Sequence, residues 1–563
     1  MRQAGGRRRT IRNARRRQGD LKLLLAELRQ YLEQVRAYLK NPQISTPEDL
    51  RHKMAYIITL AQGVRYQNFD LEKDMELDES RRRFHHGLAS ITSRLHRIAE
   101  LAHNVVRQFG HLSEPSFLND YGLLDFFDEI DLGLAMIRPA LEQQKLKMVV
   151  RLCQVEERLD ALYADRFVRL IKEMDQGLGA PGDRVTTLMV VHYLERIGDL
   201  ILEIGEEMIY VILGEALRFG QYQALVAGLK ASGYEGVPVV AGDFHSIWGG
   251  RSGCRVGVVD VDDPGASVGE PLIFKHGPAV KLEKEKSNLQ TWAELWPGLP
   301  PKVLAFIPPE NDGQAAMVLE YIKGATLKDM FLDPLLAGGA REELAAALNL
   351  MARLWRETMA DQETRAGFVR QAEKRLGSVR ALYPDLVDFN GSFGRLKIPS
   401  MADILDEAKI YERDLAAPFS VRVHGDFNLS NIMRDEKTGA LRFIDLYRSC
   451  LSDYSQDLSV LILSLLRLPL GGVFDRERLG AAASFVWTFA LDFADSVNDE
   501  TLEARLSFGL ARSYLTSARF EPRRRVAARF LGYSRHLWLK LVEYGRTGRP
   551  WADFKLDKKS LYV

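Results

Sequence analysis

The sequence is short of cysteine and has no long apolar run. Its three cysteines, Cys153, Cys254 and Cys450, are too few for a disulfide framework and lack the paired spacing of a metal site. Such sparse use of cysteine suits a reducing cytosol. The most apolar run, residues 458–466, falls far short of the ~20 residues that cross a bilayer, and the N-terminus has no apolar core of a signal peptide. We therefore expect a cytoplasmic protein without a transmembrane segment.

The sequence also lacks a net charge of any size, because 77 Lys and Arg residues offset 76 Asp and Glu residues to leave +1. No overall field draws the chain to nucleic acid, and we expect no specific nucleic-acid partner. The N-terminus is the exception, since eight arginines fall between Arg2 and Arg17, before the first acid at Asp20. We interpret residues 1–19 as a disordered, solubilising tail in preference to an arm for nucleic acid or anionic lipid.

What the sequence does contain is a polar motif in residues 423–446. Asp426 and Asn431 lie five positions apart, and two short apolar runs then flank a glycine-containing turn. This pattern predicts a β-hairpin whose outer ends meet, so that Asn431 and Asp445 face one another with Asp426 just upstream. Phosphoryl transfer from Mg-ATP needs a carboxylate that receives the acceptor's proton (Asp426), and an amide and a second carboxylate that hold metal (Asn431 and Asp445). The alternative is a buried hairpin with polar caps, which we disfavour because the full pattern is rare.

The His-Gly-Asp-x4-Asn motif that begins at His424, with the Ile-Asp pair that ends at Asp445, resembles the aminoglycoside phosphotransferase/choline kinase family. This family is the small-molecule branch of the protein-kinase-like fold. Protein kinases usually carry Arg at the position of Gly425 and Phe-Gly where residues 446–447 are Leu-Tyr. The resemblance implies a two-lobed α+β fold, ATP and Mg²⁺ as cofactors, and a small-molecule acceptor. His424 is most simply a structural loop residue, and proton acceptance then falls to Asp426.

Glycines mark a domain boundary near residue 236. A helical segment ends at Gly233 and Gly236, after which the apolar pattern becomes that of strands. We predict a linker at residues 216–236, a kinase-like small lobe at 237–325 and a mostly helical large lobe at 326–563. The acidic segment 453–458 of the large lobe also resembles the phosphotransferase family.

Three features of the small lobe fit the binding of ATP. Strand-like residues flank a glycine-rich bend that would lay backbone N–H groups over phosphates at Gly249, Gly250 and Ser252, although glycine turns between strands are common. A strand then ends in Lys275, the expected place of the cation that holds the α- and β-phosphates. The helix that follows offers Glu285 as the partner of this lysine, because apolar residues at helical spacing after it would turn it inward.

The strand-like run 315–324 resembles the hinge of kinase-like folds, in which backbone groups meet the adenine. The resemblance implies that Glu320 and Ile322 bind the cofactor. An ordinary central strand is the alternative, and both interpretations can hold.

The first half contains an internal repeat. Residues 95–101 align with residues 194–200 at an offset of 99. Each copy continues as an apolar stripe with spacings of 3 and 4, as on one face of a helix. The matched stripes are Ile91, Leu95, Ile98, Ala102, Val105 and Phe109, and Val190, Leu194, Ile197, Ile201, Ile204 and Met208. We predict two all-α three-helix bundles over residues 20–215.

Glu195 and Asp199 lie one helical turn apart in the second copy, where they could bind a hard cation or belong to a solvated face. The segment 194–199, within duplicated helical bundles, resembles the PhoU family of phosphate-signalling regulators. That resemblance implies a metal site at Glu195 and Asp199 and a phosphate-signalling protein partner. In the first copy His96 and Glu100 stand at these positions, and histidine prefers borderline ions such as zinc or iron.

The leading hypothesis is an ATP- and Mg²⁺-dependent phosphotransferase that acts on a small-molecule hydroxyl or amine, fused to a PhoU-like domain that binds a second metal. The alternative is a nucleotide-binding regulator of phosphate homeostasis without catalysis. The presence of Lys275, Asp426, Asn431 and Asp445 favours the enzyme, whereas the weak glycine loop favours the regulator. A protein kinase is disfavoured by Gly425.

Overall fold

The structure is a computed structural model of the chain. It describes residues 2–73, 77–113, 121–234, 244–246, 253–260, 270–309, 313–333, 336, 338–393, 396–469 and 473–556. Contacts divide the chain into two compact units, residues 1–276 with 305–307 and residues 277–304 with 308–563. No helix in the described ranges is long and apolar enough to cross a membrane.

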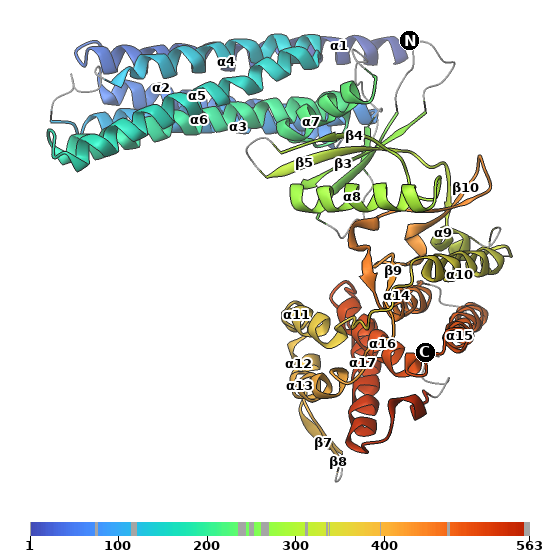
Figure 1. Cartoon of the computed structure of the whole chain (residues 1–563). Helices are drawn as coiled ribbons and strands as arrows, with labels where there is room; N and C mark the ends of the chain where they lie inside the picture. The colour runs from blue at the N-terminus through green and yellow to red at the C-terminus, as the bar shows by residue number, and fades with distance from the viewer. Residues whose placement is uncertain are drawn as a thin grey trace. The chain divides into compact units, whose positions relative to one another are not determined.

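The first unit is built mainly from long helices (Figure 1), which are α1 (Arg2–Lys40), α2 (Pro47–Glu72), α3 (Glu79–Phe109), α4 (Leu123–Gln143), α5 (Leu146–Asp175), α6 (Pro181–Leu213) and the shorter α7 (Phe219–Ala231). Helix α2 packs on α3 and α5 packs on α6, while α3 and α6 pack on one another. This arrangement confirms the predicted all-helical repeat of three-helix bundles. The basic segment 1–19 falls largely within α1, whose side chains are described from Asp20 onwards.

The apolar stripes of the repeat form the core of the helical unit. Every stripe residue of α6 is fully buried, and the stripe of α3 is at most 3% exposed. Glycine allows the neighbouring helix to come close, because a Cβ on Gly205 would lie 2.3 Å from the Sγ of Cys153 on α5. The start of α2 is fixed by a capping box, in which the side chain of Thr46 accepts from the N–H of Asp49 and the Asp49 carboxylate accepts from the N–H of Thr46.

Short strands follow α7 along the chain. They are β1 (Phe244–Ser246), β2 (Arg255–Val259) and β3 (Leu272–Pro278). Strand β2 pairs antiparallel with β1, where Phe244 faces Val259, and with β3, where Val259 faces Leu272. Burial alternates along both strands, with Val259 of β2 and Leu272 and Phe274 of β3 buried, as expected for strands.

The second unit combines short strands with helices. Strand β4 (Val303–Ile307) is divided between the units, because its residues 305–307 belong to the first. The strands of the second unit are β5 (Gln314–Glu320), β6 (Gly324–Thr326), β7 (Gly391–Phe393), β8 (Leu396–Ile398), β9 (Val421–Val423), β10 (Ile432–Asp435), β11 (Leu441–Phe443) and β12 (Cys450–Ser452). Its longer helices are α8 (Ala279–Leu295), α9 (Leu327–Leu332), α10 (Ala340–Glu357), α11 (Phe368–Arg380), α13 (Met401–Glu412), α14 (Ser455–Leu466), α15 (Val473–Ser496), α16 (Leu502–Ala518) and α17 (Arg524–Arg546). One-turn helices complete it at α12 (Pro384–Val387), η2 (Leu429–Asn431), η3 (Leu446–Arg448) and η4 (Trp551–Asp553).

Helix α16 is the centre of this second unit. It packs against α14, α17 and α11 (Figure 1), and nearly all of its residues are buried. One polar cluster lies in this core, where Arg505 of α16 lies 2.6 Å from Asp453 and also contacts Asp499, which accepts from the hydroxyl of Tyr454 at 2.6 Å. The two carboxylates balance the charge of the buried guanidinium. Mixed short sheets and packed helices confirm the predicted α+β class.

Candidate active site

The predicted hairpin is present and carries the polar motif at its base. Strands β10 and β11 pair antiparallel with Ile432 opposite Phe443. Beyond this pair, the N–H of Ile444 donates to the carbonyl of Asn431 at 3.0 Å. The hairpin therefore brings Asn431 beside the segment that leads into Asp445, as the sequence predicted.

Gly425 has a backbone conformation that favours glycine, with φ at +82°. A Cβ there would lie 2.3 Å from the carbonyl oxygen of Arg448. A larger residue cannot occupy this position unless the backbone moves. Close packing against the segment after Asp445 therefore requires the glycine between His424 and Asp426.

Two buried side chains fix the loop that carries Asp426. The backbone N–H groups of His424 and Gly425 donate to the two carboxylate oxygens of Asp457 on α14, each at 2.8 Å. The imidazole of His424 is fully buried, which lowers its pKa, so its Nε2–H donates to the carbonyl of Ile444 at 3.1 Å while Nδ1 accepts from the N–H of Asp426 at 3.3 Å. Both ring nitrogens bond backbone groups, which confirms the structural role expected for His424.

Asp426 lies at the meeting point of these elements. Its Oδ1 accepts from the side chain of Asn428 at 3.2 Å, and its backbone carbonyl accepts from Nδ2 of Asn431 at 2.9 Å. Nη1 of Arg448 lies 3.1 Å from the other carboxylate oxygen, Oδ2. The side chain of Asp426 is nevertheless 27% exposed, so a small molecule can reach it.

The residues around the hairpin fit a magnesium ion held with nucleotide phosphates. Because Nδ2 of Asn431 donates to the Asp426 carbonyl, the amide oxygen of Asn431 faces the other way and has no donor in the described part of the chain. Asp445 adopts a left-handed conformation, with φ at +61°, which aspartate tolerates better than most residues. Among the described residues no three His, Cys, Asp or Glu side chains converge as a metal cage. Mg²⁺ does not need one, since one or two carboxylates and substrate phosphates commonly hold it.

Helix α8 is tied to the segment that follows Asp445. Nδ2 of Asn288 donates to the carbonyls of Leu446 at 2.8 Å and Ser449 at 3.1 Å, and Nε1 of Trp292 donates to Oγ of Ser449 at 2.8 Å. These bonds join residues about 160 positions apart in the sequence, so no local sequence pattern predicts them.

Glu285 lies on α8 and is 4% exposed, with Leu289 and Trp292 buried on the same face. Its inward orientation matches the sequence argument, whereas Glu283 is exposed. Lys275 lies in β3, in the other contact unit, and its pairing with Glu285 stays a prediction. The predicted phosphate-binding residues Gly249, Gly250 and Ser252 lie outside the described residues.

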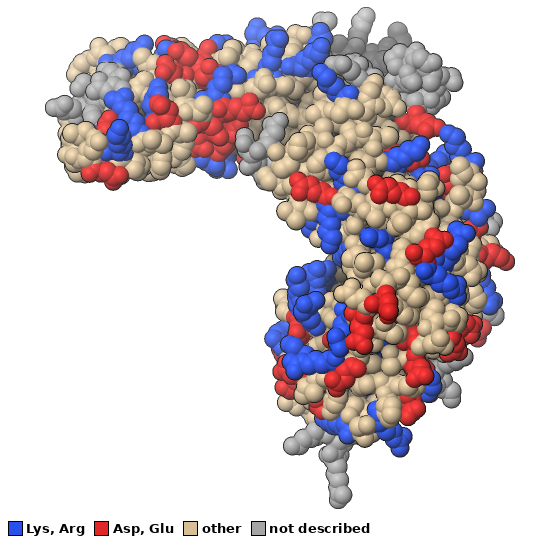
Figure 2. All heavy atoms as spheres, viewed as in Figure 1, with Lys and Arg blue, Asp and Glu red and all other residues tan. Residues whose placement is uncertain are grey.

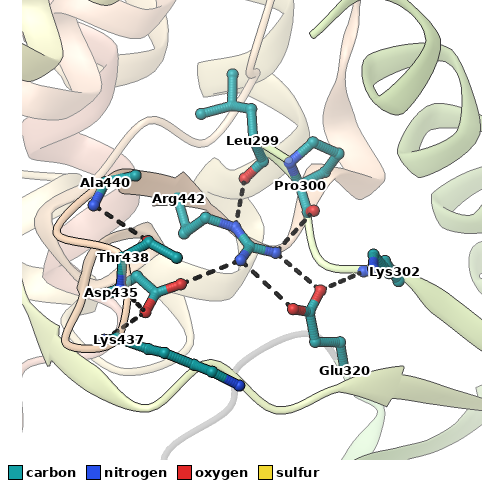
Figure 3. Close-up of polar contacts among 9 residues, drawn as sticks. All are labelled: Leu299, Pro300, Lys302, Glu320, Asp435, Lys437, Thr438, Ala440 and Arg442. Carbon is teal, nitrogen blue, oxygen red and sulfur yellow. Dashed lines mark hydrogen bonds and ion pairs between the residues drawn. The ribbon is translucent and has the colours of Figure 1, made fainter. Parts of the chain in front are cut away.

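Glu320 is predicted to lie at an adenine-binding hinge, but its carboxylate belongs to a cluster of hydrogen bonds around Arg442 (Figure 3). Oε2 accepts from Nη2 of Arg442 at 2.8 Å and from the N–H of Lys302 at 3.0 Å. Arg442, 8% exposed at its side chain, also lies 3.3 Å from Asp435 and donates to the carbonyl oxygens of Leu299 at 3.3 Å and Pro300 at 3.1 Å. The N–H of Glu320 donates to the carbonyl of Lys302 at 3.0 Å. Any adenine contact through Glu320 would therefore use its backbone carbonyl, and the proposed contact of Ile322 stays a prediction.

Glu195 and Asp199 face a second acidic pair that the sequence argument missed. Glu156 and Asp160 on α5, also one turn apart, repel them; burial and the charges of Asp160 and Asp199 raise the pKa of Glu156 to about 7. Glu195 lies 3.2 Å from His192, and Asp199 pairs with Arg196. The spacing of four between Glu156 and Asp160 could have predicted from the sequence that they share one face of a helix.

The first repeat is different, because His96 and Glu100 lie 3.3 Å apart and contact each other. Metal binding at either copy stays a prediction, and no metal cage is found in the described ranges.

The fold and the hairpin define a phosphotransferase-type domain joined to a helical repeat, and comparisons with family models agree. Residues 259–493 match the model described as the phosphotransferase enzyme family, and residues 125–208 match the PhoU domain. The chain therefore carries a PhoU domain in its N-terminal half and a phosphotransferase-family domain in its C-terminal half. The PhoU match lies on the second repeat, which also keeps the Glu-x3-Asp motif.

Solved structures similar to this chain include two small-molecule kinases. The aminoglycoside phosphotransferase APH(3'')-Id from Streptomyces rimosus is 20% identical, with 57% of this chain and 98% of that chain covered and a TM-score of 0.30. An ethanolamine kinase from Plasmodium vivax is 13% identical, with 58% and 88% covered and a TM-score of 0.36. No curated protein matches the chain.

Proposed function

We propose that the C-terminal half transfers the γ-phosphoryl group of Mg-ATP to a hydroxyl or amine of a small molecule. The observation that carries the proposal is the convergence of Asp426, Asn431 and Asp445 at the base of one hairpin, within a domain that matches the phosphotransferase family. Since ATP and Mg²⁺ abound there, we place the reaction in the cytoplasm.

Each residue has a stated task in this proposal. Asp426 orients the acceptor and takes its proton as the new oxygen–phosphorus or nitrogen–phosphorus bond forms. Asn431 and Asp445 would hold the magnesium ion, which neutralises charge on the phosphates when bound. Lys275 would hold the α- and β-phosphates.

The alternative is a regulator that binds nucleotide without turnover, and ADP release distinguishes the two. Purified full-length protein is incubated with Mg-ATP and a panel of hydroxylated and amino metabolites, and ADP is measured. The enzyme proposal expects acceptor-dependent ADP release that Asp426→Asn removes while nucleotide binding persists. Nucleotide binding with no acceptor-dependent ADP release for any compound would support the regulator instead.

We propose that the PhoU domain links this activity to phosphate status through a protein partner. Support comes only from the domain match at residues 125–208. A pull-down from phosphate-starved and phosphate-replete cells tests it, and an identical set of bound proteins in both states would contradict it.

A further inference from the structure

A buried arginine lies close to the loop that carries Asp426. Arg512 of α16 is 7% exposed. Its Nη2 donates to the side chains of Gln456 at 3.1 Å and Ser459 at 3.4 Å, and its guanidinium lies 5.3 Å from the ring centre of Phe368. Among the described residues its Nε has no hydrogen-bond partner, and its Nη2 bonds only the neutral side chains of Gln456 and Ser459. A buried guanidinium usually has a carboxylate against it, as Arg505 has, so Arg512 lacks an anion.

The position of Arg512 relates it to the acceptor side of the site. Gln456, which accepts from Arg512, also donates to the carbonyl of Gly425 at 3.5 Å. One amide side chain therefore separates the guanidinium from the residue next to Asp426. Gln371 of α11 also donates to Gln456, at 3.2 Å. Hydrogen bonds thus connect polar side chains of α11, α14 and α16 to the loop that carries Asp426.

A second arginine, Arg448, contacts the carboxylate of Asp426 from the segment that follows Asp445. Arg448 lies 3.1 Å from Asp426, and its side chain is 51% exposed. Burial and repulsion from Arg448 together lower the pKa of Arg512 to about 10, against the attraction of Asp426 and Glu412. Arg448 and Arg512 therefore repel one another, and both are attracted by the carboxylate of Asp426, the proposed proton acceptor.

The surface over α11, near these two arginines, is also positively charged. Helix α11, which supplies Phe368 and Gln371, has Arg370 and Lys374 exposed, and basic side chains gather over α11 on the face drawn in Figure 2. A cationic acceptor would approach against this charge, whereas an anionic one would be attracted.

We infer that the acceptor carries an anionic group, a carboxylate or a phosphate, which Arg512 and Arg448 hold while its hydroxyl or amine faces Asp426. This inference rests on the proposed function and names its substrate class. In the reaction the acceptor's O–H or N–H proton passes to Asp426, the acceptor atom bonds to the γ-phosphorus, and the bond from that phosphorus to the β–γ bridging oxygen breaks. ADP leaves with that electron pair.

The test uses acceptors that share a carbon skeleton and differ in charge. The three-carbon series is glycerate, glycerol 3-phosphate, glycerol and 3-amino-1,2-propanediol. The six-carbon series is gluconate, glucose 6-phosphate, glucitol and glucosamine. ADP release by the full chain is measured at saturating Mg-ATP, with binding of a non-hydrolysable ATP analogue as a separate readout. We expect at least one anion to show kcat/KM about tenfold or more above its neutral and cationic counterparts, and the carboxylate and phosphate arms identify which anion is preferred.

Variants connect the preference to the arginines. Arg512→Gln should raise KM for the preferred anion about tenfold or more, since charge-assisted hydrogen bonds are lost, and Arg512→Lys should restore part of it. KM for ATP and analogue binding should not change. Arg448→Gln, at a half-exposed position, is the second variant if Arg512→Gln fails to fold. Arg353→Gln, exposed on α10, is the matched control and should leave all constants unchanged.

Several outcomes overturn the inference and leave the proposed function intact. In the first, the protein binds nucleotide but turns over only neutral or cationic acceptors. In the second, it binds nucleotide but no anion of the two series stimulates ADP release. In the third, KM for the anion is unchanged in folded Arg512→Gln and Arg448→Gln. Failure of the analogue to bind would instead contradict the proposed function.

Discussion

The backbone N–H of Gly425 donates to a carboxylate oxygen of Asp457 at 2.8 Å, across 32 positions of sequence. The other oxygen of Asp457 accepts from His424, so one side chain holds two consecutive amides of the loop. Asp457 is fully buried, and burial raises its pKa to about 7 against the opposing effect of these hydrogen bonds. The position of Asp426 thus depends on a residue outside the proposed catalytic set.

Asp457→Asn is expected to misplace the loop. An amide can accept from only one of the two N–H groups and presents its own NH₂ to the other, which leaves a buried donor unsatisfied at a cost of about 1–3 kcal/mol. We expect the rate of ADP release to fall roughly 100-fold, the effect of a small misplacement, with affinity for Mg-ATP within a few-fold. Steady-state kinetics and calorimetry measure the two. Wild-type kinetics in a folded variant would show that Asp457 does not position the loop.

Asp426→Asn tests the proton acceptor directly. Asparagine keeps the shape of the side chain and cannot take a proton, so acceptor-dependent ADP release should be abolished while nucleotide affinity stays within a few-fold. Asp492→Asn, an exposed aspartate on α15, is the matched control and should behave as wild type. Near-wild-type turnover in Asp426→Asn would remove Asp426 from this role.

Local pattern predicted the hairpin, because strand alternation and the turn lie within two dozen residues. It also predicted both apolar stripes of the helical repeat, since helical spacing fixes which residues share a face. Burial of Glu285 followed from the same spacing on α8.

Side-chain partners that are distant in sequence could not be predicted in this way. Asn288 bonds the Leu446 carbonyl 158 positions away, and Arg442 bonds Glu320 122 positions away. Nothing in the neighbouring residues encodes such a partner, because it depends on how separate elements pack. Asp457 belonged to an acidic segment noted for its resemblance, but its two bonds to the loop emerge only in the folded chain.

Asn431→Ala and Asp445→Ala address the magnesium site. Both residues are proposed metal ligands, so each variant should bind Mg-ATP about tenfold or more weakly, a loss that even outer partners of a metal can cause. Calorimetric titration with ATP is run with and without Mg²⁺. The metal-free affinity should not change, because the ligands act through the ion. Unchanged binding of Mg-ATP in both variants would make the hairpin structural only.

Gly425→Ala tests the close packing of the loop. The left-handed conformation costs an alanine about 1–2 kcal/mol, and its Cβ would press on the Arg448 carbonyl. We expect a loss of stability of at least this size in denaturant titration, with reduced turnover. Gly377→Ala on α11 is the control: its Cβ meets nothing within 4 Å, so it should be neutral or stabilising by about 0.4–1 kcal/mol. Equal stability of the two variants would contradict the packing argument.

The last prediction concerns the acidic pairs of the helical unit and their pH dependence. Burial and the neighbouring carboxylates raise the pKa of Glu156 from 4.5 to about 7 in the folded state. The folded chain therefore holds this proton more tightly than the unfolded chain. The stabilising contribution is fully present below pH 4.5 and is lost as pH rises towards 7. Thermal unfolding of the helical unit should accordingly shift to lower temperature between pH 5 and pH 8.

Glu156→Gln should flatten this pH dependence and raise the unfolding temperature at pH 8, because the glutamine carries no charge against Asp160 and Asp199. Glu157→Gln, at the adjacent position of α5, is the matched control: the pKa of Glu156 is affected more by Asp160 and Asp199 than by Glu157, so this variant should change the curve less. A divalent cation bound at the predicted pair Glu195 and Asp199 would also raise the unfolding temperature at pH 8 in wild type, and less so in Glu195→Gln. The same pH dependence in wild type and Glu156→Gln would show that these carboxylates do not interact in the folded protein.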